Sequence, residues 1–202
     1  MSALQGMGMP APLARIDFSP SLGDVFNAPD TTSGERRTMR EVARARTPAG
    51  LARAQALAKD GGKQMWSDIA REYRDEHGPI MGWIGTGLMQ AAIAVTDLTV
   101  HALKFFNDRK RPFEADSELR SEGGSPEGSS FPSAHTAASF AAAAVMGKLW
   151  PERKDEFRGL AQEMGRSRVY LGVHYPSDVA AGAGVGNAIG QAFGGASLLP
   201  GL

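Results

Sequence analysis

The amino-acid sequence contains several cationic and imidazole side chains at spacings that suit the binding and transfer of an oxyanion. Lys104 is followed by a cationic run at 109–111, which ends at Pro112. Runs of charge usually form a solvated face, but this proline stops the element and fixes the direction of the side chain before it. We therefore take Lys104 and Arg111 as candidate ligands of an anion.

Another cation falls on an apolar helix face. Apolar side chains recur at about 100° per residue along 151–170, and Arg168 stands within this stripe, four residues after Met164. A guanidinium on a buried face is unfavourable unless it meets an anion. Two interpretations follow: an internal ion pair with an Asp or Glu, or an anion-binding site that opens into the core.

Two histidines lie beside predicted helix starts. Ser133 stands at an N-cap position two residues before His135, and the free N–H groups of a helix start bind oxyanions. His174 precedes Asp178 by four residues across a turn, so the carboxylate can accept a ring N–H and raise the basicity of the other nitrogen. Each feature alone fits an ordinary cap or a structural pair. Their combination with the cations favours a catalytic site.

The elements that position these side chains are predicted to be helical. Residues 1–35 are rich in Gly, Pro and Ser and are expected to form a flexible N-terminal arm, whereas 36–202 form one helical domain. No stretch alternates with a period of two over more than a few residues, so the predicted fold is an all-α, single-domain bundle. The expected helices after Glu35 include 63–77, 80–107, 136–150, 151–170 and 177–193, with a long acidic loop over 113–131.

Composition narrows the function. The chain has 202 residues, a formal net charge of zero and no cysteine. A whole-protein positive field for nucleic acid is therefore excluded, as are disulfides and Cys-ligated metals. The N-terminus shows no signal peptide, and the apolar stretch 80–106 contains four residues that are unfavourable in lipid: Gln90, Asp97, His101 and Lys104. We expect a soluble cytoplasmic protein without a transmembrane span, with periplasmic location or secretion by a non-classical route as the alternative.

Three segments resemble the motifs of the type 2 phosphatidic acid phosphatase and vanadium haloperoxidase superfamily in order and in internal spacing. They are KFFNDRKRP at 104–112, PSAH at 132–135 and SRVYLGVHYPSD at 167–178. Residues next to the second and third motifs are similar to those of soluble bacterial class A non-specific acid phosphatases, which are all-helical and metal-independent. The resemblance covers about residues 80–195 and implies the helical bundle of that superfamily.

The resemblance also implies a role for each motif residue. His174 would be the nucleophile that forms a phosphohistidine, with Asp178 orienting it, and His135 would be the general acid and then the general base. The phosphate oxygens would be held by Lys104, Arg111, Arg168, Ser133 and Ala134. The second motif has Ala134 where the family usually has Gly, and its backbone N–H remains available to a phosphate oxygen.

The predicted function is hydrolysis of phosphate monoesters, without a metal or other cofactor, on a small phosphorylated substrate; phosphate or vanadate would fit the same site. The first alternative is a lipid or isoprenoid (pyro)phosphate phosphatase at a membrane surface. Further alternatives are a vanadate-dependent haloperoxidase and a non-catalytic protein that kept the fold. The acidic loop 113–127 is expected to be solvated, with a lid over the site as the alternative.

Overall fold

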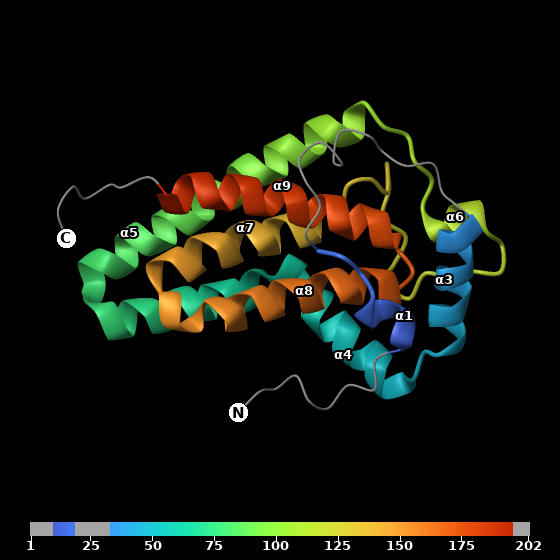
Figure 1. Cartoon of the computed structure of the whole chain (residues 1–202), viewed down its shortest axis with the longest axis horizontal. Coiled ribbons are helices and arrows are strands. Elements are labelled where there is room, and N and C mark those ends of the chain that lie inside the picture. The colour runs from blue at the N-terminus through green and yellow to red at the C-terminus, as the bar shows by residue number, and fades with distance from the viewer. Residues whose placement is uncertain (1–9, 19–32, 196–202) are drawn as a thin grey trace.

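The computed structural model describes residues 10–18 and 33–195, and this part of the chain is built from helices and loops without a strand (Figure 1). The all-α prediction is therefore confirmed. The α-helices are α1 (Ala11–Ala14), α3 (Ser33–Arg44), α4 (Pro48–Ala58), α5 (Lys63–Phe105), α6 (Pro112–Ala115), α7 (Ala134–Leu149), α8 (Lys154–Tyr170) and α9 (Pro176–Gly195), with 3₁₀ turns η1 (Lys59–Gly62) and η2 (Pro151–Arg153).

Helix α7 is the centre of the bundle and packs against α5, α8 and α9. Its Ala-rich sequence is buried along most of its length, as expected for a helix that is covered on several sides. Gly186 and Gly190 bring α9 against it: a Cβ atom on either would lie 2.1 Å from the carbonyl oxygen of Ala137 or 2.5 Å from that of Ala141. This close contact holds the second half of α9 against the first half of α7.

Helix α5 reverses direction within one continuous helical stretch. At Gly78 the backbone adopts φ 85° and ψ 167°, and Pro79 follows. The sequence predicts two helices separated at this dipeptide, and the structure places a sharp kink there instead of a loop. The two halves of α5 run along different sides of α7, as the green ribbon in Figure 1 shows.

Part of the predicted N-terminal arm packs on the domain. Leu13 and Phe18 are buried, and the Phe18 ring stacks on that of Phe140 with centroids 5.6 Å apart. Helix α3 starts at Ser33, inside the range expected to be flexible. The remainder of the arm, 1–9 and 19–32, lies outside the described residues.

The acidic segment after α6 is fixed at several points. Asp116 forms an ion pair with Arg40 at 2.8 Å, Leu119 is buried, and the N–H of Glu122 donates to the carbonyl oxygen of Leu171 at 2.8 Å. Several acidic side chains of this segment are exposed, as expected for a solvated loop, while the Asp116 side chain is held to α3 and the Glu122 backbone to the end of α8.

Candidate active site

The predicted motif residues meet at one end of the bundle. The end of α5, the starts of α7 and α9, and the end of α8 gather on the right of Figure 1. Arg111 Nη1 lies 3.4 Å from His174 Nε2, although the two residues are 63 positions apart in the chain. The structure thus brings the first and third motifs together around one imidazole.

Backbone carbonyls orient two of the cations. Arg111 Nη1 donates to the carbonyl oxygen of Val173 at 2.9 Å, and Nη2 donates to those of Glu127 and Ser129 at 3.3 and 3.4 Å. Lys104 Nζ donates to the carbonyl oxygen of Ser129 as well. Because carbonyls do not neutralise a cation, both side chains are positioned while their positive charge remains available.

Arg168 is 5% exposed, and its Nε atom has no hydrogen-bond partner. No ion pair joins its guanidinium to an Asp or Glu within residues 10–18 and 33–195. Of the two interpretations of this buried arginine, the described structure therefore favours an anion site over an internal pair. Burial and, to a smaller extent, repulsion from Arg111 lower the pKa of Arg168 to about 10.

The carboxylate behind His174 is buried and has several partners. Asp178 Oδ2 lies 3.4 Å from His174 Nδ1 and accepts the N–H of Tyr175 at 2.8 Å, and Oδ1 accepts from Arg109 Nη1 at 2.6 Å. Burial by itself raises the pKa of Asp178, but the His174 ring and Arg109 outweigh that effect, so the pKa lies below its usual range. The imidazole therefore has an ionised carboxylate on the side away from Arg111.

Arg109 and Glu35 extend this chain of contacts, and the sequence analysis assigned neither to the site. Arg109 Nη2 pairs with Glu35 Oε2 at 2.7 Å, and Glu35 Oε1 accepts from the N–H of Ser177 at 3.2 Å. Arg109 also lies over the Tyr175 ring, 4.5 Å from its centroid. Arg109 could have been suspected from its place in the cationic run, whereas no local pattern marks Glu35.

The second motif differs in detail from its prediction. Ser133 is at the N-cap position of α7, but its side chain makes no capping hydrogen bond. Its Oγ atom accepts from Thr136 Oγ1 at 2.9 Å, and its N–H donates to the carbonyl oxygen of Asp178 at 3.0 Å. The Ser133 hydroxyl hydrogen and the N–H of Ala134 at the helix start are thus not used in a cap. Both are suited to donate to an anion.

Both histidines are held in their neutral form by this environment. Burial lowers the pKa of His135 to about 3, with further contributions from Arg168, His174, Arg111 and Lys104. Burial likewise lowers the pKa of His174 to about 4, partly offset by Asp178. Burial and Arg111 lower the pKa of Lys104 to about 8, with Asp178 opposing them. The site therefore carries an excess of positive charge, which an anion would relieve.

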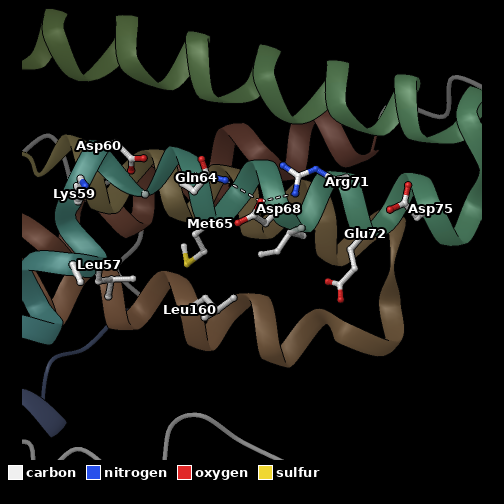
Figure 2. A pocket seen from close by; sticks show the side chains of 13 residues that line it. Leu57, Lys59, Asp60, Gln64, Met65, Asp68, Arg71, Glu72, Asp75 and Leu160 are labelled. Atoms are coloured by element: carbon white, nitrogen blue, oxygen red, sulfur yellow. Dashed lines mark hydrogen bonds and ion pairs between the residues drawn. The ribbon is translucent and has the colours of Figure 1, made fainter.

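A hollow of about 940 Å³ on the described surface lies elsewhere (Figure 2). It follows the first half of α5 opposite α8. Among its lining residues, Gln64 Nε2 donates to Asp68 Oδ1 and Arg71 pairs with the same carboxylate, both at 3.0 Å. The described residues contain no group of three or more His, Cys, Asp or Glu side chains arranged to hold a metal ion.

A family model described as the PAP2 superfamily matches residues 86–194, more than half of the chain. The chain belongs to the PAP2 superfamily. The matched range includes all three motifs, so the resemblance stated from the sequence is confirmed.

Curated relatives of the chain include two kinds of phosphatase. A non-specific acid phosphatase of Salmonella typhi is 39% identical over 98 residues, which cover 44% of this chain and 36% of that enzyme. A decaprenylphosphoryl-5-phosphoribose phosphatase of Mycobacterium tuberculosis is 45% identical over 65 residues, covering 32% of this chain and 36% of that protein. The matches thus span about a third of the length of these relatives.

Two solved PAP2-type structures share the fold. A transmembrane PAP2 type phosphatidylglycerolphosphate phosphatase from Bacillus subtilis gives a TM-score of 0.61 at 20% identity, covering 86% of this chain and 89% of that one. LpxE of Aquifex aeolicus gives 0.66 at 24% identity, covering 80% and 95%. At these identities the likeness establishes the helical fold.

The prediction of a soluble cytoplasmic protein is wrong, and the findings point to membrane association. One of the similar structures is a transmembrane phosphatase, and the described helical stretch Pro48–Phe105 contains a window long and apolar enough to cross a membrane. Only 22% of that window is buried, unlike the core helix of a globular protein. The sequence argument counted polar residues of 80–106 against lipid, but Asp97 and Lys104 are partly buried and face the protein.

Proposed function

We propose that this PAP2 protein is a metal-independent phosphatase that hydrolyses phosphate monoesters through a phosphohistidine on His174. The supporting observation is the position of His174 Nε2, 3.4 Å from Arg111 Nη1, with buried Asp178 on the opposite side of the ring. A phosphate bound by Arg111, Lys104 and Arg168 has its equatorial oxygens neutralised, which is what phosphoryl transfer chiefly needs.

The proposed reaction has two displacements. His174 Nε2 attacks phosphorus while the P–O bond to the leaving alcohol breaks. His135, which is neutral in the free site, takes up the proton that the phosphate monoanion brings and passes it to the leaving oxygen. Water then attacks the phosphohistidine, His135 accepts the water's proton, and the P–N bond breaks to release inorganic phosphate. Asp178 holds the imidazole tautomer and stabilises its positive charge in both steps.

Hydrolysis of p-nitrophenyl phosphate in the presence of EDTA tests the proposal, together with trapping of acid-labile, alkali-stable phosphate on the protein after rapid quenching. We expect activity that vanadate inhibits and label on His174 by peptide mapping. An inactive wild-type protein between pH 4 and 8, or label on another residue, would contradict it.

The pH profile is expected to follow the substrate's own ionisation. Since His135 and His174 are both neutral well above pH 4, the proton for the leaving group enters with the phosphate monoanion. We expect kcat/KM to fall about tenfold per pH unit above about pH 6, the second pKa of a phosphate ester. With a more acidic phosphate ester the break should move down by the difference in pKa. If kcat/KM begins to fall at the same pH for both esters, the fall reports the ionisation of an enzyme group and not that of the substrate.

Arg109 is proposed as a positioning residue for Asp178. In Arg109→Gln the carboxylate loses its 2.6 Å partner and Glu35 loses its 2.7 Å partner. We expect kcat to fall about 10- to 100-fold with KM nearly unchanged, because the cations that bind phosphate are untouched. Arg153→Gln, which removes an arginine paired with Glu156 at the far end of α8, is the control. An equal rise in KM would contradict a positioning role.

A second candidate function, action on a membrane lipid phosphate, is favoured by the apolar surface at the end of α5. Phe105 and Phe106 are 85% and 84% exposed and directly follow Lys104. Leu98, about two turns earlier on α5, is 73% exposed. Aromatic side chains at such positions suit insertion at a lipid interface, and they would bring the phosphate-binding end of the bundle to the membrane.

Co-flotation with liposomes tests whether this surface binds a membrane. We expect wild-type protein to float with phosphatidylglycerol vesicles and the Phe105→Ser/Phe106→Ser variant to lose most of that binding, because two large exposed apolar side chains are removed. Activity on p-nitrophenyl phosphate should persist and serves as the control for folding. Flotation that is the same for both proteins would remove this surface as the site of contact.

A further inference from the structure

A cleft of about 520 Å³ is lined by His135 and by none of the motif cations. Both halves of α5 and the start of α7 form its walls, and the left-handed turn before α5 closes one end. The residues that matter for its chemistry are Asp60, Lys63, Gln90, Asp97 and His135.

The turn at the closed end places backbone directly against the histidine. Asp60, Gly61 and Gly62 have φ values of 54°, 72° and 77° in succession. A Cβ atom on Gly61 would lie 3.6 Å from Nε2 and Cδ2 of His135, so the glycine leaves the space beside that nitrogen open. Since His135 is the proposed acid and lines this cleft, the cleft offers space for the alcohol that His135 protonates.

The charged groups of the cleft are not paired with one another. No hydrogen bond or ion pair joins the side chains of Asp60, Lys63 or Asp97 to another residue of the described ranges. Burial raises the pKa of Asp97, with His101 and Lys63 opposing that effect. The carboxylates of Asp60 and Asp97 outnumber the one ammonium, that of Lys63, so the cleft has a net negative charge. The neighbouring phosphate site contains three cations.

We infer that this cleft is the leaving-group subsite and that it selects phosphate monoesters of small polar alcohols bearing a protonated amine. The inference rests on the proposed phosphatase function. A second anionic group on the alcohol would meet Asp60 and Asp97, whereas an ammonium would meet two carboxylates that no hydrogen bond or ion pair of the described residues engages. Gln90 and Lys63 provide further polar contacts for hydroxyl groups at the rim.

Three substrates of similar size test the subsite: phosphoethanolamine, propyl phosphate and phosphoglycolate, whose alcohols are cationic, neutral and anionic. We expect kcat/KM to decrease in that order. In Asp97→Asn the advantage of phosphoethanolamine over propyl phosphate should shrink about five-fold, the size of one partly exposed charge contact. Asp68→Asn, an identical change of charge in the other hollow, should leave all ratios unchanged.

The outcomes separate the two proposals. Equal kcat/KM for the three esters, or an unaltered ratio in Asp97→Asn, would overturn the subsite while p-nitrophenyl phosphate hydrolysis still supported the phosphatase. Failure to hydrolyse p-nitrophenyl phosphate would overturn the phosphatase and the subsite together. Circular dichroism of Asp97→Asn establishes that any change in ratio arises in a folded protein.

Discussion

Replacement of His174 by alanine is expected to abolish hydrolysis of phosphate monoesters, with kcat/KM lower by at least about 10⁴-fold. The substitution removes Nε2, the atom proposed to attack phosphorus. It also leaves the three cations in place, because Arg111 Nη1 keeps its hydrogen bond to the carbonyl oxygen of Val173 at 2.9 Å. Phosphate binding should therefore survive the loss of chemistry.

Two measurements make this result specific to the nucleophile. We expect vanadate to inhibit the wild-type protein. We also expect calorimetry to detect vanadate binding to His174→Ala, which would show that the anion site remains. His101→Ala is the matched control, since His101 is exposed, lies outside the three motifs and places its Nδ1 2.7 Å from the carbonyl oxygen of Asp97. Full activity in His174→Ala, or phosphoprotein trapped in that variant, would refute the assignment.

The candidate site could be predicted from the sequence to the extent that its chemistry is encoded locally. The spacing from His174 to Asp178 and the position of Ser133 before α7 depend on a turn and a helix start, which short segments determine. The same holds for Arg168, whose place on an apolar face follows from helical periodicity. The roles of these residues came from the motif resemblance and stay predictions.

Other features depend on how distant segments pack. Glu35 reaches Arg109 across 74 positions of the chain, so no window of the sequence could link it to the site. The contact between α9 and α7 through Gly186 likewise exists only in the folded bundle. Membrane association was missed for a related reason: composition alone did not reveal that Asp97 faces a cleft while Leu98, its neighbour, faces outward.

Arg168→Met is expected to separate activity from stability. We expect kcat/KM to fall about 10²- to 10³-fold, the usual effect of removing one charged group that stabilises a transferring oxyanion. Stability should stay the same or increase, because the free protein holds this guanidinium 5% exposed and without an anionic partner among its described residues. Replacing a buried charge by an apolar side chain of similar length removes that desolvation penalty.

The matched control for this substitution is Arg166→Met, two positions earlier on α8. Arg166 pairs with Glu163 at 2.7 Å, and Glu163 is itself buried. The Arg166→Met variant therefore leaves a buried carboxylate without this ion pair. We expect it to unfold at a lower temperature and to keep its activity. Thermal unfolding with and without 10 mM phosphate measures both effects: phosphate should stabilise wild type and Arg166→Met more than Arg168→Met. If Arg168→Met instead loses stability in phosphate-free buffer, Arg168 has a structural role in the free protein, and its assignment to the anion site fails.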